Sequence, residues 1–165
     1  MTDRRPVVLV GMDRSPGADA ALRYAVGEAR RRGGRVLAIA VAEGPALGAL
    51  DAESMPVNPE AVRQTLARRA RQHTDELLAG IEGGADVSVE VRARLGRATS
   101  VLVHAARDAD LLVVGHRGRG PIRTALLGSV GLGCILHASC PVTIVRATPA
   151  DRTPGPGARA VEAAP

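Results

Sequence analysis

The chain has 165 residues, 45% of them hydrophobic, and a formal net charge of +5 at pH 7. All 22 of its basic residues are arginine, which excludes mechanisms that need a lysine, such as a Walker A site or a Schiff base. It contains no Trp or Phe and one Tyr, so it lacks the aromatic platforms on which single-stranded nucleic acids stack. The positive charge alone therefore gives little support for binding of nucleic acid.

A chain of this length can form one domain with a real core, filled here by Val, Leu, Ile and Ala. The spacing of Cys134 and Cys140 matches neither a redox pair nor a zinc site. The first apolar run is too short for a secretion signal, and no run has the length that crosses a bilayer. We therefore expect a cytoplasmic protein with no membrane partner.

The first third of the chain predicts strand, helix, strand. Residues 6–11 form a short apolar run typical of a buried strand. A helical pattern follows, with Ser15 as its expected cap, Pro16 in its first turn, and Gly33 with Gly34 at its end. Residues 35–43 predict a second buried strand, and 44–57 a loop rich in glycine and proline.

The remainder continues this alternation. A long helix is expected from the cap Asn58, with the ring of His73 packed at the edge of the core. The alternating pattern of 86–94 predicts a half-buried edge strand. A short helix (97–109), a strand (110–115), a helix from Ser129 to about Ala138 and a last strand (140–147) follow. Gly131 and Gly133 disfavour that last helix by about 1 kcal/mol each, which predicts a loose helix start.

This order predicts an α/β fold, because strands that alternate with helices form parallel sheets with right-handed crossovers. We expect a single doubly wound sandwich, with a five-stranded parallel sheet in the order 3-2-1-4-5 and helices on both faces. Residues 1–147 would form this domain. Residues 148–165 are rich in Pro, Gly and Ala without periodicity, so we expect a disordered tail.

A glycine-rich stretch, "GHRGRGPIRTALLGSVG", follows the fourth strand. Ligands of open α/β sheets bind beyond the carboxyl ends of the strands, where the ends of the first, second and fourth strands should converge. Gly115 and Gly118 on one side, and Gly128 and Ser129 on the other, would let backbone amides approach a polyphosphate closely, and a helix that starts at Ser129 favours anions. The alternative is an ordinary surface loop in which Ser129 caps the helix.

The spacing Gly-x2-Gly-x9-Gly-Ser in this stretch resembles the ATP-binding signature of the universal stress protein family. The segments "VVLVGMDRSPGADAALRYAVGEA", "DADLLVVGHRGRG" and "GSVGLGCILHASCPVTIVR" agree with it, so the resemblance covers residues 5 to 147. It implies binding of ATP, AMP or ADP, with Asp13 near the ribose, the phosphates or Mg²⁺, and a homodimer through the last strand, Val142–Val145. The nucleotide-binding residues that it implies are Gly11, Met12, Asp13, Val41, Val114, Gly115, His116, Arg117, Gly118, Gly128, Ser129 and Val130.

Binding is predicted here without turnover. Hydrolysis of ATP needs a positioned water and charge neutralisation at the γ-phosphate, and His116 is the one candidate general base, with an exposed loop residue as the alternative. Arg117, Arg119 and Arg123 either pair with phosphates or are solvated. The expected function is a nucleotide-dependent sensor or regulator in the stress response with a protein partner. The alternatives are a slow ATP-hydrolysing enzyme of related fold and a nucleotide-independent dimer.

Overall fold

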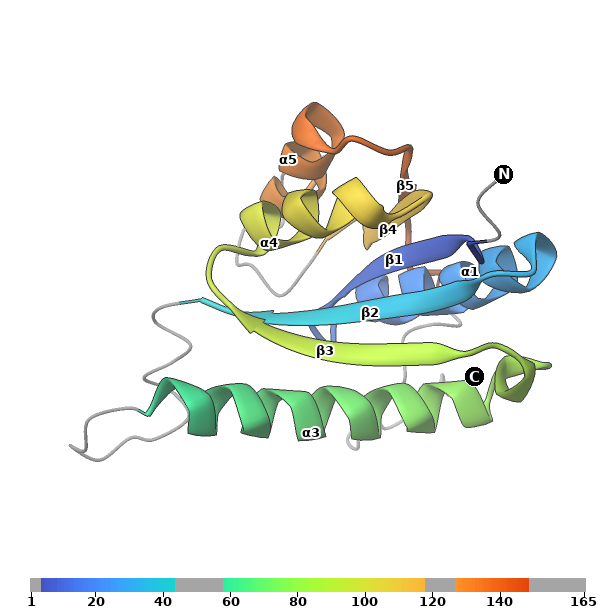
Figure 1. Cartoon of the computed structure of the whole chain (residues 1–165), viewed down its shortest axis with the longest axis horizontal. Helices are drawn as coiled ribbons and strands as arrows, with labels where there is room; N and C mark the ends of the chain where they lie inside the picture. Colours follow the sequence, from blue (N-terminus) through green and yellow to red (C-terminus); the bar gives the residue numbers. More distant parts are fainter. Residues whose placement is uncertain (1–3, 44–57, 118–126, 149–165) are drawn as a thin grey trace, which may run out of the picture.

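The computed structural model describes residues 4–43, 58–117 and 127–148 (Figure 1). One sheet of five parallel strands has the order β3-β2-β1-β4-β5. The strands are β1 (Val7–Met12), β2 (Arg35–Ala42), β3 (Val89–Leu95), β4 (Leu111–Gly115) and β5 (Val142–Val145). The helices are α1 (Pro16–Arg32), α3 (Pro59–Ala79), α4 (Ala98–Ala105) and α5 (Ser129–His137). Two short 3₁₀ turns occupy Gly84–Asp86 and Ala106–Asp108. The predicted fold class and strand order are confirmed.

Helices cover both faces of the sheet, and each face has its own aliphatic core. Helices α1 and α3 cover one face, and α4 and α5 cover the other (Figure 1). Leu9 and Leu112 point toward α4 and α5, whereas Val10 and Val113 point toward α1 and α3, and all four are fully buried. No helix in the described part of the chain is long and apolar enough to cross a membrane.

The helix ends follow the predicted capping chemistry. The Ser15 Oγ accepts a hydrogen bond from the Ala18 amide at 3.2 Å, and Gly33 ends α1 in the left-handed region at a φ of 62°. Asn58 caps α3 by accepting from the Glu60 amide at 3.0 Å. The expected loop 44–57 and nearly all of the expected tail lie outside the described residues.

The ring of His73 lies at the edge of the core, as expected, and it has a partner that the sequence did not indicate. Its Nε2 is 2.7 Å from the Oδ1 of Asp19, in the first turn of α1. Both side chains are largely buried, with 18% and 16% of their surface exposed. The pair therefore ties α3 to the beginning of α1.

The two glycines of α5 serve close packing, a role that the sequence did not indicate; the expectation of a loose helix start stays a prediction. A Cβ atom on Gly133 would overlap the Thr99 side chain of α4. A Cβ on Gly131 would lie 3.1 Å from the Leu127 Cδ1 and 3.4 Å from the Ile144 Cδ1. Gly133 thus lets two helices approach each other more closely than any side chain would allow.

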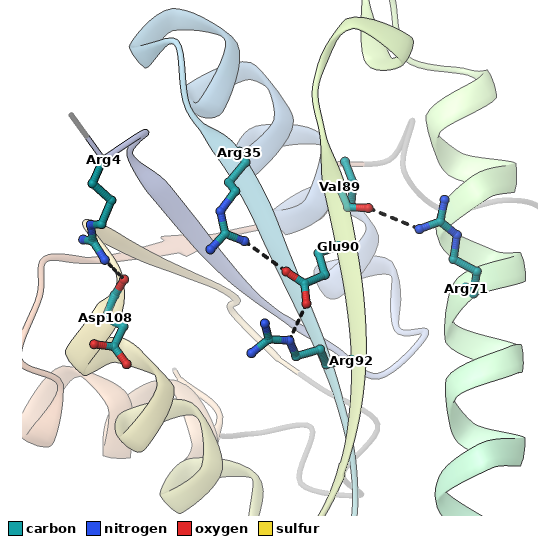
Figure 2. Close-up of polar contacts among 7 residues, drawn as sticks. All are labelled: Arg4, Arg35, Arg71, Val89, Glu90, Arg92 and Asp108. Atoms are coloured by element: carbon teal, nitrogen blue, oxygen red, sulfur yellow. Dashed lines mark hydrogen bonds and ion pairs between the residues drawn. The ribbon is translucent and has the colours of Figure 1, made fainter.

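Arginine side chains cover the outer edge of strand β3. The Val36 amide donates to the Ser88 carbonyl, so the backbone groups of the odd-numbered residues of β3 face away from β2. Arg71 of α3 donates to the outward carbonyl of Val89 at 3.2 Å (Figure 2), and Arg94 donates to that of Ala93 at 3.0 Å. On the same strand, Glu90 bridges Arg35 and Arg92 (Figure 2). Because these carbonyl groups already accept hydrogen bonds, this edge is disfavoured for pairing with another strand.

Candidate functional site

The carboxyl ends of β1, β2 and β4 converge, as predicted, because β1 lies between the other two strands. Met12 ends β1 opposite Ala40, so Val41 lies one residue further along β2. Asp13 follows β1 directly, and Gly115 ends β4. The strand order alone thus brings three of the predicted segments to one edge of the sheet.

The two ends of the glycine-rich segment meet at this edge. The amide of His116 donates to the Val145 carbonyl of β5 at 2.6 Å. The carbonyl of His116 accepts from the Gly128 amide at 3.0 Å. The His116 side chain is half-buried. The predicted Gly118, Arg119 and Arg123 lie outside the described residues.

The N-terminus of α5 differs from those of the other three described helices. Side-chain oxygens accept backbone amides at the starts of α1 and α3, and the Glu43 Oε1 accepts from Ala98 at the start of α4 at 2.6 Å. Gly128 caps α5 without a side-chain hydrogen bond, so Ser129 is the first helical residue and not the cap. The first backbone bond of this helix runs from Leu132 to Gly128.

The first amides of α5 consequently make no described hydrogen bond that a ligand would have to displace. The amides of Ser129, Val130 and Gly131 have no acceptor within the described part of the chain. They lie at the positive end of the helix dipole. Ser129 is exposed and Val130 is half-buried. This arrangement suits an oxyanion such as a phosphate.

Apolar residues of the site lie on the face of the sheet that α4 covers. Val41 and Val114 both belong to that core. Only 3% of the surface of Val114 is exposed. A Cβ on Gly11 would come within 2.9 Å of the Leu102 Cδ1, so this glycine makes room for α4. The Met12 side chain points to the opposite face, under α1, and is 6% exposed. At the carboxyl edge of the sheet, Met12 therefore contributes its backbone and not its side chain.

Asp13 is held by the turn that joins β1 to α1. Its Oδ1 accepts a hydrogen bond from the Ser15 amide at 3.0 Å, and Arg14 between them has a φ of 62°, in the left-handed region that few non-glycine residues adopt. Among the described residues, no group of three His, Cys, Asp or Glu side chains could hold a metal ion. A magnesium ion at this edge would take Asp13 together with phosphate and water oxygens.

Three residues that shape this edge were not predicted from the sequence. The Ser15 Oγ lies 3.4 Å from the Arg117 carbonyl, in addition to capping α1. Gly17 lies directly against Gly115 and Arg117, and Glu43 occupies the N-terminus of α4. Each of the three contacts a residue far away in the sequence, and local spacing does not indicate such contacts. The "SPG" after Asp13 is the one signal in the sequence, and helix capping is sufficient to explain it.

Residues 5–146 match the model of the universal stress protein family. A universal stress protein of Mycolicibacterium smegmatis is 36% identical over 146 residues, which cover 87% of this chain and 47% of the relative. A universal stress protein of Mycobacterium tuberculosis (strain ATCC 25618 / H37Rv) is 36% identical over 142 residues, or 84% and 45% of the two chains. The chain thus spans about half the length of the curated relatives it matches.

Solved structures share the fold. The universal stress protein UspA of Lactobacillus plantarum superposes with a TM-score of 0.62 at 22% identity, over 88% of this chain and 100% of that one. A universal stress protein in complex with cAMP gives 0.59 at 24% identity, over 88% and 100%. One from Archaeoglobus fulgidus in complex with dAMP gives 0.59 at 21%, over 87% and 99%. With the family match over nearly the whole described domain, we conclude that the chain belongs to the universal stress protein family.

Proposed function

We propose that this chain binds an adenine nucleotide, with ATP as the expected ligand and AMP or ADP as alternatives, at the carboxyl edge of the sheet. The observation that carries the proposal is the N-terminus of α5, the one described α-helix start whose amides donate to no side-chain oxygen. The hydrogen bond from Gly128 to His116 keeps these amides beside the end of β4. The complexes of two structural neighbours with cAMP and dAMP support adenine as the base.

In this proposal the residues divide between the two ends of the nucleotide. The phosphates lie against the amides of Ser129 and Val130, where the helix dipole stabilises negative charge. The adenine lies toward Val41, whose side chain is only half-buried at the end of β2. Asp13 contacts the ribose or a magnesium ion that neutralises the phosphates, and the backbone of Gly11 and Met12 borders the nucleoside.

The proposed role is sensing, with the nucleotide as the signal and a regulatory protein in the cytoplasm as the recipient. A general base must come within hydrogen-bond reach of the attacking water, and His116 is the one described candidate beside β4. The backbone of His116 makes the hydrogen bonds that hold the two ends of the glycine-rich segment together, which supports a structural role for this residue. Slow hydrolysis of ATP remains the alternative activity.

We further propose a homodimer through β5. The hydrogen bonds from Leu112 to Pro141 and from His116 to Val145 leave the backbone groups of Val142 and Ile144 facing the outer edge. No hydrogen bond within the described part of the chain uses these groups. The other edge of the sheet is blunted by Arg71 and Arg94, so β5 is the edge that a second copy can extend.

An apolar stripe on α5 adjoins this edge. Among the described residues, four large hydrophobic side chains are exposed, and three of them are Leu132, Ile135 and Leu136, at 48–65%. Their spacing places them on one side of the helix, and Gly131, one turn before Ile135, lies against Ile144 of β5. A second copy that pairs with β5 would also cover this stripe.

The test is mass spectrometry of small molecules released on denaturing the purified protein, together with calorimetric titration of ATP, ADP, AMP and cyclic AMP. We expect an adenine nucleotide in the released fraction and saturable binding of at least one titrant. Absence of both would refute the nucleotide proposal and favour the nucleotide-independent dimer. Sustained release of phosphate from ATP with Mg²⁺ would favour the enzyme instead.

A further inference from the structure

We propose that Gly17, which lies outside the glycine signature, is a positioning residue of the nucleotide site. The inference rests on the proposed function. The first turn of α1 sets where residues 115–117 lie, and this turn can approach them only because position 17 has no side chain. Through His116, the same residues fix the start of α5, where the phosphates bind.

The contact between Gly17 and the end of β4 is one of backbone against backbone. A Cβ on Gly17 would lie 2.7 Å from the Arg117 carbonyl oxygen and 3.5 Å from the Gly115 Cα. In return, a Cβ on Gly115 would lie 2.8 Å from the Gly17 carbonyl oxygen and 2.9 Å from the Ala18 nitrogen. Real Cβ atoms essentially never come within 3.0 Å of such atoms, so either substitution must separate the two segments.

Gly17 and Gly115 are needed for their lack of a side chain, because their backbone conformation does not require glycine. The described glycines with a left-handed φ are Gly33, Gly83 and Gly96. Gly17 lies within the first turn of a regular α-helix and is buried. There, alanine would favour helix formation by about 1 kcal/mol. The unfavourable effect of a side chain at this position therefore comes from its contact with residues 115–117.

Other contacts fix the first turn of α1, so a side chain at position 17 displaces the loop and not the helix. The Asp13 Oδ1 accepts the Ser15 amide, and Asp19 pairs with His73 of α3 at 2.7 Å. The Ser15 Oγ also donates to the Arg117 carbonyl at 3.4 Å. A displaced Arg117 carbonyl therefore moves the adjacent His116, whose carbonyl accepts the Gly128 amide.

The test compares Gly17→Ala with Gly27→Ala, the same substitution on the same helix. A Cβ on Gly27 would meet the Arg31 side chain at an ordinary 3.6 Å, so this variant should bind ATP and cyclic AMP like the wild type. For Gly17→Ala we expect an unchanged circular dichroism spectrum and an affinity lower by about tenfold, as when one hydrogen bond to a charged group is lost. We also expect faster hydrogen exchange at the Gly128 amide, a readout that needs no nucleotide.

Each outcome decides between the proposals. If Gly17→Ala binds within twofold of the wild type, the role of Gly17 is overturned while nucleotide binding stands. If the wild type binds neither nucleotide, both proposals are overturned. Should Gly17→Ala fail to fold, Ser15→Gly takes its place, because glycine is tolerated as a helix cap and removes the hydroxyl that reaches Arg117. Its affinity should fall about threefold, and wild-type affinity would overturn the inference.

Discussion

The carbonyl oxygen of His116 accepts a hydrogen bond from the amide of Gly128 at 3.0 Å. One backbone bond thus joins the end of β4 to the start of α5 across the segment that carries the family signature. Because His116 also donates to Val145, the junction includes β5, the strand of the proposed dimer. His116 therefore lies between the proposed nucleotide site and the proposed dimer edge, so a change at either one can act on the same backbone junction.

Replacing Gly128 tests this junction. Gly128 has a φ of −68°, which proline also adopts, so Gly128→Pro removes the donor at small cost in backbone strain. We expect its affinity for ATP to be about three- to tenfold lower than that of Gly128→Ala, which keeps the amide. Calorimetry measures both variants. Equal affinities would mean that the bond to His116 does not help to hold the nucleotide.

The fold was predictable because its signals are local. The apolar runs mark the buried strands, and Ser15, Asn58 and Gly33 mark helix ends by chemistry within one turn of the chain. The alternating pattern of β3 correctly predicted a half-buried edge strand. Such signals need no knowledge of what lies across the fold.

The glycines were harder to interpret, because the reason for each lies in a distant segment. Gly133 was expected to weaken α5, yet it faces Thr99 of α4. Gly115 is predicted to let the backbone approach a phosphate, and a Cβ on it would also meet Gly17, a contact that the spacing did not indicate. The partner of His73 was missed for the same reason, since Asp19 lies on another helix. Sequence spacing cannot identify contacts that tertiary packing creates.

The apolar stripe of α5 predicts which surface variant weakens the proposed dimer. Leu136 is 65% exposed, so Leu136→Glu should leave the fold intact and place a charge in the proposed interface, where it would lie unpaired. Sedimentation should show a shift toward monomer. Tyr24→Glu is the matched control, because Tyr24 is the other exposed large hydrophobic residue of the described chain and lies on α1. If both variants remain dimeric, the interface lies elsewhere.

The arginines at the edge of β3 predict a variant that assembles further. Asp75 holds the guanidinium of Arg71 at 3.1 Å, and that group covers the Val89 carbonyl. Arg71→Ala exposes the carbonyl, so we expect this variant to form larger species than the wild type in sedimentation at high concentration. Arg68→Ala removes a neighbouring charge from the same helix and serves as the control. An unchanged size distribution for Arg71→Ala would show that the edge is closed by other means.

The two thiols should react slowly in the folded protein. Burial raises the pKa of Cys134 to about 11 and also raises the pKa of Cys140. At pH 8 both groups therefore carry less of the reactive thiolate than an ordinary cysteine. With a disulfide reagent we expect Cys140, which is half-buried, to react before Cys134, and both to react fast once the protein is unfolded. Rapid labelling of Cys134 in the native protein would contradict this order.

The crossing of α4 and α5 predicts that alanine, although the better helix former, destabilises the protein at position 133. The overlap of a Cβ with the Thr99 side chain should cost about 1–3 kcal/mol of unfolding free energy, against about 1 kcal/mol gained in helix propensity. Thr99→Ala removes the overlapping methyl group, so the double variant should recover stability relative to Gly133→Ala alone. Thermal unfolding of the four proteins measures the coupling. Additive effects would show that the two side chains do not meet, and that Gly133 is no more than a poor helix former.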